Sequence, residues 1–152
     1  LAHVDAWQWR PDLIWFDNLS SIGSPNYYVQ KIFSNYSGTH IVPALSGGKA
    51  LTGQNGMYVS STIDRKNGKL YIKIVNSTEK PVPVQLGLGR LPYVKAAVKQ
   101  TLRSDGREDF NSVSGGESIK PVTTPVRING RRVDDAMEPF SVNVLIIDFK
   151  VR

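Results

Sequence analysis

All three tryptophans of the chain lie within residues 6–18, in the segment AWQWRPDLIWFDN. A second aromatic run, SPNYYVQKIF, follows at residues 24–33. Beyond Pro43 the pattern changes to short stretches of alternating apolar and polar residues, separated by glycine and proline. This asymmetry predicts an aromatic strand–helix unit joined to a β-rich domain.

The first unit has the pattern of a strand followed by a helix. Residues 12–16 (DLIWF) form a short apolar run, which is typical of a strand buried on both faces in a parallel sheet. Ser24 can cap a helix that begins at Pro25, and Gly38 is placed to end that helix. One face of the predicted helix carries the apolar residues Tyr28, Val29, Ile32, Phe33 and Tyr36.

Residues 53–152 have the pattern of an antiparallel sandwich. The turn pairs at residues 67–68 and 129–130 are both Asn-Gly between alternating stretches, which is a strong hairpin signal. Residues 82–86 suggest an edge strand because of the prolines there, and the polar residues 105–116 predict a loop. Several short strands with turn signals indicate a sandwich of two antiparallel layers. The expected interior positions are Ile72, Val75, Val144, Ile146 and Phe149.

The net charge of +6 and the absence of cysteine narrow the classes of function. Without cysteine, disulfides and thiolate chemistry are excluded. The excess of positive charge falls in the β-rich part, where the cations are dispersed except for a cluster at residues 127–132. We favour a solvated surface over nucleic-acid binding, because the aromatic residues are concentrated in the N-terminal part instead of among the cations.

Three aspartates near the tryptophans raise the hypothesis of a sugar site: Asp5, Asp12 and Asp17. Aromatic rings stack on sugars, and glycoside cleavage requires two carboxyl groups about 5–9.5 Å apart. The alternative is that Trp15 and Phe16 belong to the core and that the aspartates end the strand. We favour this alternative for the two aromatics and for Asp12.

Two tryptophans precede the strand, and Trp7 and Trp9 could line a cleft. His3 and His40 have no companions at the spacing of metal ligands, so no metal site is expected. No phosphate-binding loop or nucleophile motif is present either, and no cofactor is expected.

The segments HVDAWQWRPDLIWFDN and SPNYYVQKIFSNYSGTHIVP, with PFSVNVL at residues 139–145, resemble α-L-arabinofuranosidases of glycoside hydrolase family 51. In that family a W-x-P-D-x-I-x-F-[ND] strand is followed by a [TS]-P-x-Y-[YW]-V-Q-x-[LF]-F helix and then by a β-sandwich. The resemblance covers the whole chain, and it is specific over residues 1–43.

The resemblance implies a mainly β fold in two parts. Residues 1–42 would be the terminal βα unit of a truncated (β/α)8 barrel, and residues 43–152 a jelly-roll-like antiparallel β-sandwich. Residues 12–16 would be the eighth barrel strand and residues 25–35 the eighth helix. Because barrel active sites lie at the C-terminal ends of strands, Trp9, Asp17 and Asn18 are expected at the rim of the substrate pocket.

The resemblance also implies a retaining enzyme that removes non-reducing-end α-L-arabinofuranosyl residues from hemicellulose or pectin side chains. The family uses two glutamates on earlier barrel strands, an acid/base and a nucleophile. Residues 1–38 contain no glutamate, and the first one is Glu79. We therefore expect no catalytic residue in this chain and a supporting role for it within the full-length hydrolase.

Two other functions stay open. The sandwich could be an autonomous carbohydrate-binding module that stacks sugars on Tyr58, Tyr71 or Tyr93. A nucleic-acid binder ranks below it. The expected partner is an arabinose-containing polysaccharide or oligosaccharide, reached through the full-length enzyme, with neither nucleic acid nor membrane as a partner.

A chain that begins with Leu1 is expected to be processed or cut from a longer one, and a periplasmic or extracellular location is favoured over a cytoplasmic one. Without barrel neighbours, the strand at residues 12–16 would expose its backbone and its apolar surface. We expect the unit either to fold back on the sandwich, with Tyr28, Ile32 and Phe33 in contact, or to form a homo-oligomer.

Overall fold

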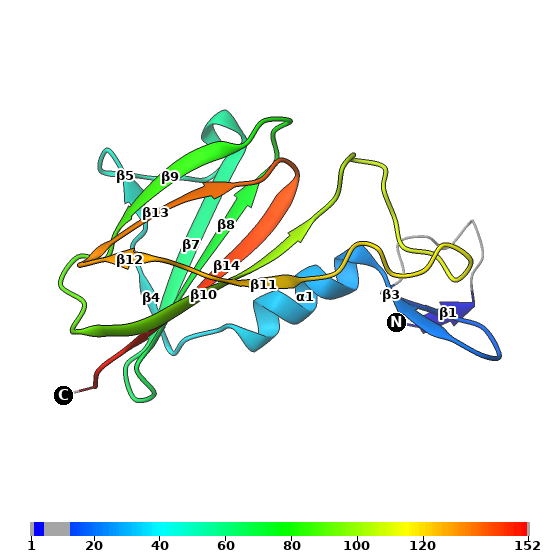
Figure 1. Cartoon of the computed structure of the whole chain (residues 1–152), viewed down its shortest axis with the longest axis horizontal. Helices are drawn as coiled ribbons and strands as arrows, with labels where there is room; N and C mark the ends of the chain where they lie inside the picture. The colour runs from blue at the N-terminus through cyan, green and yellow to red at the C-terminus, as the bar shows by residue number, and fades with distance from the viewer. Residues whose placement is uncertain (1, 5–12, 152) are drawn as a thin grey trace.

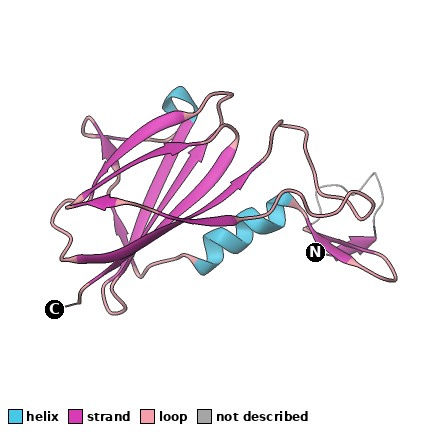
Figure 2. Ribbon diagram, viewed as in Figure 1, coloured by secondary structure: helices cyan, strands magenta, loops and turns pink. Residues whose placement is uncertain are grey.

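The computed structural model describes residues 2–4 and 13–151. Figure 1 and Figure 2 show a body of strands, with one helix lying along its side and a small strand unit at one end. The mainly β, antiparallel architecture that the sequence predicts is confirmed.

A six-stranded antiparallel sheet is the larger of the two layers. Its central strand β14 comes from the most apolar stretch of the chain and pairs with β8 and β10. The hairpin predicted at Asn67 and Gly68 is confirmed, because this turn joins β7 to β8. In spatial order the strands are β11 (Val122–Pro125), β10 (Val94–Arg103), β14 (Ser141–Phe149), β8 (Lys69–Asn76), β7 (Met57–Asp64) and β4 (His40–Val42).

A three-stranded sheet packs against one face of the larger sheet. It consists of β12 (Ile128–Asn129), β13 (Arg132–Met137) and β9 (Val82–Gly87), and β9 lies at its edge as the prolines predict. The second predicted hairpin is also confirmed, since Asn129 and Gly130 connect β12 to β13. The core between the sheets contains Ile74, Val133, Met137, Leu145 and Ile147, all fully buried. Short elements complete this part: β5 (Leu45–Ser46), β6 (Lys49–Ala50) and the 3-10 turn η2 (Gln54–Gly56).

Helix α1 (Pro25–Asn35) covers the other face of the six-stranded sheet. Its start is as predicted, because the Ser24 hydroxyl oxygen accepts a hydrogen bond from the Tyr27 N–H at 3.2 Å. Ile32 is 1% exposed and packs in a cluster with Leu102, Ile119 and Val144. The chain is therefore layered as helix, large sheet and small sheet.

The predicted interior is confirmed for Ile72, Val144 and Phe149, which are buried, whereas Val75 and Ile146 are half-buried. The layering also divides these residues between two faces. Ile72 and Phe149 lie between the sheets, but Val144 and Ile146 pack on the helix side. Val75 pairs with Val142, which also belongs to the helix side. Neighbouring residues of a strand point to opposite faces, and both faces of β14 are covered, so apolar character did not reveal which face each residue occupies.

The predicted role of Gly38 is wrong. The cap of α1 is Tyr36, whose N–H donates to the Ile32 carbonyl. A Cβ atom on Gly38 would lie 2.6 Å from the backbone of Ile63. Gly38 is needed because the chain passes close to β7, where its N–H donates to Thr62 Oγ1 at 2.9 Å.

The N-terminal unit contains β1 (Ala2–Val4), β2 (Ile14–Phe16) and β3 (Ser21–Gly23). β2 pairs in parallel with β1 and antiparallel with β3, so the expectation that its edges are open is wrong. Of the residues in β2, Trp15 is buried and Phe16 is exposed, so β2 is not buried on both faces in this chain. Of the two expected arrangements, the structure has the folded-back one, and self-association stays a prediction.

The fold-back differs from expectation at one residue. Tyr28 and Ile32 pack on the outer face of the large sheet, whereas Phe33 is 39% exposed. The division into domains at residue 42 stays a prediction. β4, which lies just before that division, hydrogen-bonds to β7 in the large sheet.

Candidate functional site

The junction between β3 and α1 is held by side chains from the loop at residues 104–120. The Asn111 side-chain amide donates to the carbonyls of Gly23 and Ile119, each at 2.8 Å, and its oxygen accepts from the Ile119 N–H at 2.8 Å. Glu117 Oε1 accepts from the Gly23 N–H at 2.6 Å. Both backbone polar groups of Gly23 are thus bound by the loop. We call Asn111 and Glu117 the clamp.

The clamp extends to the helix through Tyr28. Burial is the larger cause, and hydrogen bonding to Glu117 the second, of a rise in the pKa of the Tyr28 phenol to about 12. Gly23 allows this close packing, because a Cβ atom there would lie 2.6 Å from the Tyr27 ring. Asn111 itself is 1% exposed, so it is a buried polar group with each of its bonds made inside the protein.

The free energy of unfolding of the Tyr28→Phe variant will fall less at alkaline pH than that of the wild type. The folded-state pKa of about 12 lies above the reference value of 10.0, so the neutral phenol stabilises the fold at low pH. That contribution is complete below about pH 10 and is lost as the pH rises through about 12. Urea unfolding of both proteins at about pH 8 and about pH 11 measures the effect. The stability difference between them should shrink at the higher pH, and an unchanged difference would contradict this role.

The predicted rim residues lie at the carboxyl end of β2 as far as the structure describes them. Asp17 Oδ1 accepts from the N–H groups of Leu19 at 2.8 Å and Ser20 at 2.7 Å. These bonds lower the pKa of Asp17 and hold the turn into β3. Asn18 is exposed in the same turn. A role for either residue at a substrate pocket stays a prediction.

The other aromatic and acidic candidates divide into two groups. Trp15 is buried and its ring lies 6.2 Å from that of Phe110, so the core interpretation of Trp15 is confirmed. The same interpretation is wrong for Phe16, which lies on the other face of β2 and is 39% exposed. The second group lies outside the described residues and comprises Asp5, Trp7, Trp9 and Asp12.

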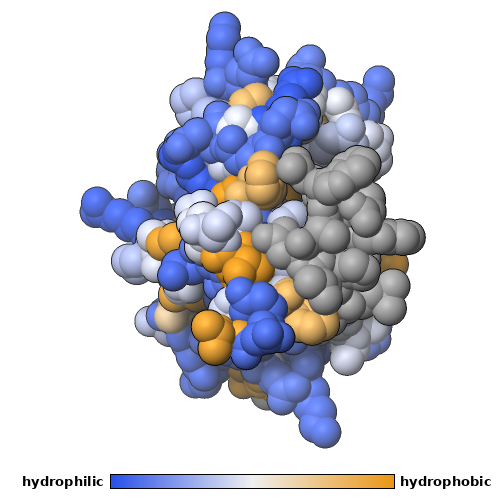
Figure 3. Space-filling model, turned by 90° about the vertical axis from the view of Figure 1, so that its right-hand side faces the viewer, coloured by the Kyte–Doolittle hydropathy of each residue, from blue (hydrophilic) through white to orange (hydrophobic). Residues whose placement is uncertain are grey.

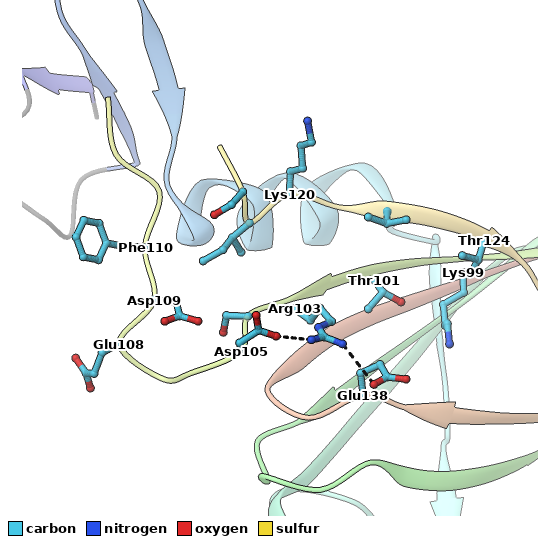
Figure 4. A pocket seen from close by; sticks show the side chains of 14 residues that line it. Lys99, Thr101, Arg103, Asp105, Glu108, Asp109, Phe110, Lys120, Thr124 and Glu138 are labelled. Atoms are coloured by element: carbon cyan, nitrogen blue, oxygen red, sulfur yellow. Dashed lines mark hydrogen bonds and ion pairs between the residues drawn. The ribbon is translucent and has the colours of Figure 1, made fainter. Parts of the chain in front are cut away.

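A polar cavity of about 760 Å³ lies between β10, β11 and the loop that carries the clamp. Figure 4 shows Arg103 between two carboxylates; it pairs with Asp105 and, at 3.6 Å, with Glu138. Asp109 Oδ2 accepts from the Gly106 N–H at 2.6 Å. Three of the four acids that line the cavity, Asp105, Asp109 and Glu138, thus have local partners, and the fourth is Glu108.

A second cavity, of about 970 Å³, lies between the two sheets and is mainly apolar. Its walls are core residues of β7, β8 and β9, and its lining includes the cations Arg65, Arg90 and Lys150. Among the residues that the structure describes, its lining contains no aspartate or glutamate.

The described part of the chain offers no group of three or more residues that could hold a metal ion. His40 is exposed, and its Nδ1 lies 2.9 Å from the Thr39 hydroxyl. Across residues 2–4 and 13–151, no helix is long and apolar enough to cross a membrane.

The three tyrosines proposed as sugar platforms are not assembled into one surface. Tyr71 lies 5.9 Å from Tyr36 of the helix side. Tyr58 and Tyr93 are 47% and 75% exposed. Tyr58 on β7 pairs with Val75 of β8, which in turn pairs with Val142 near the start of β14. The Tyr93 carbonyl accepts a hydrogen bond from Lys150, just beyond the end of β14. They therefore occupy opposite ends of the sheet.

Sequence comparison places these features among known proteins. The family model of the α-L-arabinofuranosidase C-terminal domain matches residues 1–141. α-L-Arabinofuranosidase 1 of Arabidopsis thaliana is 32% identical over 121 residues, which cover 75% of this chain and 17% of that protein. An extracellular exo-α-L-arabinofuranosidase of Streptomyces chartreusis is 54% identical over 44 residues, which cover 29% of this chain and 5% of that protein.

A solved structure shows the same fold. The arabinose-bound GH51 α-L-arabinofuranosidase MgGH51 matches with a TM-score of 0.86 and 26% identity, over 99% of this chain and 23% of that chain. The chain thus spans less than a quarter of each of these relatives.

Proposed function

Because this chain belongs to the α-L-arabinofuranosidase C-terminal domain family, we propose that it is the C-terminal part of a retaining α-L-arabinofuranosidase. The whole protein removes non-reducing-end α-L-arabinofuranosyl residues from hemicellulose or pectin side chains. In this proposal the chain supports the active site and leaves the catalytic glutamates to an upstream barrel.

The observation that carries the proposal is the attachment of the strand–helix unit to the sandwich. Ile32 is buried on the outer face of the large sheet, and the clamp binds both backbone groups of Gly23. β2 pairs with β3, which ends at Gly23. The sandwich therefore positions β2, whose carboxyl end carries Asp17 and Asn18, the proposed rim of the substrate pocket.

The glutamates of the chain support a non-catalytic role. Glu79 lies 4.0 Å from Arg107, and Glu138 pairs with Arg103. Glu117 belongs to the clamp. The fourth, Glu108, is in the exposed loop of the polar cavity. A retaining glycosidase requires two carboxyl groups about 5–5.5 Å apart, one as nucleophile and one as acid/base. Three of the four glutamates are instead paired with other groups of the chain.

The exposed apolar surface of the N-terminal unit supports the proposal that a barrel packs against it. Figure 3 shows apolar atoms gathered near the centre of the face at this end of the molecule. The large apolar side chains exposed on the unit and on the adjacent loop are Phe16, Leu19 and Phe110. Among the residues that the structure describes, the buried Trp15 indole N–H has no hydrogen-bond acceptor. A barrel packed at this end would cover the apolar groups.

The purified chain will not hydrolyse an aryl α-L-arabinofuranoside, whereas the full-length polypeptide will. Without proton donor and nucleophile, only positioning effects remain. Release of the aryl group measures turnover. NMR of the first product formed by the full-length protein should show the α-anomer of arabinose, as retention requires.

Turnover by the chain alone would contradict the proposed division of roles. If Asp17→Asn abolished such turnover, the catalytic site would be an aspartate-based one in this chain. In the full-length protein, Asn111→Ala replaces no residue of the barrel but removes three hydrogen bonds of the clamp, one of them to Gly23. We expect activity of that variant to be lost at a lower temperature than in the wild type.

The alternative, an autonomous carbohydrate-binding sandwich, is disfavoured by the separation of Tyr58 and Tyr93. Incubating the chain with insoluble arabinoxylan tests it directly. Depletion of the chain from solution, reversed by soluble arabinoxylan, would favour the alternative over a purely supporting role.

A further inference from the structure

We propose that one end of the sandwich binds a polysaccharide that carries carboxylates, such as a polyuronate. The inference rests on the proposed function, because it assigns a partner of the same glycan class to a second surface of the chain. We call this surface the basic end. Its exposed cations are Arg65, Lys66, Arg90, Lys95, Arg127, Arg131, Arg132 and Lys150.

Backbone hydrogen bonds bring these separate segments together. The Leu88 N–H donates to the Arg131 carbonyl at 2.9 Å, which joins the β12–β13 turn to the β9–β10 loop. The Lys150 N–H donates to the Tyr93 carbonyl at 2.8 Å, and the Phe149 N–H donates to the Gly68 carbonyl at 2.9 Å. The segment after β14 is thus bonded to both the start of β10 and the β7–β8 turn.

The whole charge excess of the protein is located at this end. With Lys69, it contains nine of the nineteen basic residues and three of the thirteen acidic residues, Asp64, Asp134 and Asp148. Among the residues that the structure describes, the other eight basic and eight acidic residues balance. The charge excess of the described chain is therefore a property of one surface.

Most of these cations have no carboxylate partner among the described residues. Asp148 pairs with Lys69 at 2.6 Å, and Asp134 lies 3.9 Å from Arg132. Asp64 accepts hydrogen bonds from Asn67. The ion pairs in this part of the chain leave out Arg65, Lys66, Arg90, Lys95, Arg127, Arg131 and Lys150. Unpaired cations on one surface attract a polyanion.

An exposed aromatic ring distinguishes this surface from a plain basic patch. Tyr93 is 75% exposed and lies in sequence between Arg90 and Lys95. Its carbonyl accepts a hydrogen bond from the Lys150 N–H, so this exposed ring belongs to a segment that is bonded to the C-terminal cationic segment. A flat ring stacks on the apolar face of a sugar while neighbouring cations bind a carboxylate, and this combination suits an acidic sugar.

The location suits a polymer better than a small ligand. In Figure 1 the β12–β13 turn, the β9–β10 loop and the C-terminus lie at one end of the molecule, and the N-terminal unit lies at the other. A long acidic chain could bind the basic end while its side groups reach the other end, where the proposed rim residues lie.

Binding of the 152-residue chain to polygalacturonate tests the inference, with neutral arabinan and single-stranded DNA as comparison probes. The test variant replaces Arg90, Arg127 and Lys150 with glutamine. The matched control replaces Lys49, Lys80 and Lys120 with glutamine; these lysines are exposed elsewhere and take part in none of the ion pairs within the described chain. Both variants lose three positive charges, so net charge alone cannot separate them.

We expect polygalacturonate to bind, neutral arabinan not to bind, and binding to weaken as salt is added. The test variant should bind about tenfold more weakly, and the control should bind nearly as the wild type does. Tyr93→Ser should also weaken binding. Equal losses in both triple variants, or DNA binding tighter than polygalacturonate, would overturn the inference.

Failure of this inference is distinguishable from failure of the proposed function. Hydrolysis of the small aryl substrate by the full-length protein should be unchanged in the Arg90/Arg127/Lys150 variant. The β9–β10 loop, the start of β12 and the C-terminus, which carry these substitutions, lie at the end of the molecule opposite the N-terminal unit (Figure 1). A full-length protein without that activity would overturn the proposed function and leave the binding result intact.

Discussion

Replacing Ile147 with alanine will lower the free energy of unfolding by about 2–5 kcal/mol. Ile147 is fully buried between the two sheets, on the central strand β14. The residues around Ile147 are packed between two sheets, and β14 is hydrogen-bonded to a strand on each side. The cavity left by the substitution therefore cannot collapse freely. Urea unfolding monitored by tryptophan fluorescence measures the change. The dependence of the free energy of unfolding on urea concentration should be the same for both proteins.

Ile146→Ala is the matched control for this prediction. Ile146 has the same side chain and is the adjacent residue, but it is half-buried on the helix side. Its truncation should cost about 1–2 kcal/mol, since part of the removed surface is already in water. A larger loss at Ile146 than at Ile147 would show that the two faces of β14 are assigned the wrong way round.

Replacing Ile32 with alanine will destabilise the chain by about 2–5 kcal/mol. Ile32 is the buried residue of α1 and packs with Leu102, Ile119 and Val144 on the large sheet. Because these residues come from the helix, a loop and two strands, the loss should appear in the unfolding of the whole chain. Chemical denaturation measures the loss, and limited proteolysis reports whether residues 13–38 open first.

The neighbouring residue is the control. Phe33 is larger but 39% exposed, and its ring lies 4.5 Å from the Lys73 ammonium. Phe33→Ala should cost less than about 1 kcal/mol, the range of an exposed cation–π contact. If Ile32→Ala accelerated proteolysis of the helix but left the main unfolding transition unchanged, the helix would be a separate local unit. That result would contradict the idea that the sandwich holds it.

The elements themselves were predictable because their signals are local. Ser24 and Pro25 begin a helix through capping and a preset φ angle, which involve residues within one turn. Asn-Gly pairs produce the hairpins β7–β8 and β12–β13 for a similar reason. The burial of Trp15 followed from a short apolar strand, and the absence of glutamate before Glu79 was read directly from the chain.

The clamp was not predictable from the sequence. Asn111 and Glu117 lie in a polar, glycine-rich loop, and they bind Gly23 across 88 and 94 residues of chain. The amide and the carboxylate are common loop residues, and no spacing marks them as partners of a particular backbone. Only the position of the loop beside the β3–α1 junction decides this function.

The sequence by itself determined the helix, the hairpins, the β-rich class and the family resemblance, because each depends on contacts between near neighbours or on the order of residues. The tertiary structure alone decided which face of β14 meets the helix, why position 38 must be glycine, and where the charge gathers. These depend on strand order, which places residues 65, 90, 127 and 150 at one end of the sheet although they are far apart in the chain. A dispersed charge pattern in the sequence therefore becomes one basic end in the folded protein.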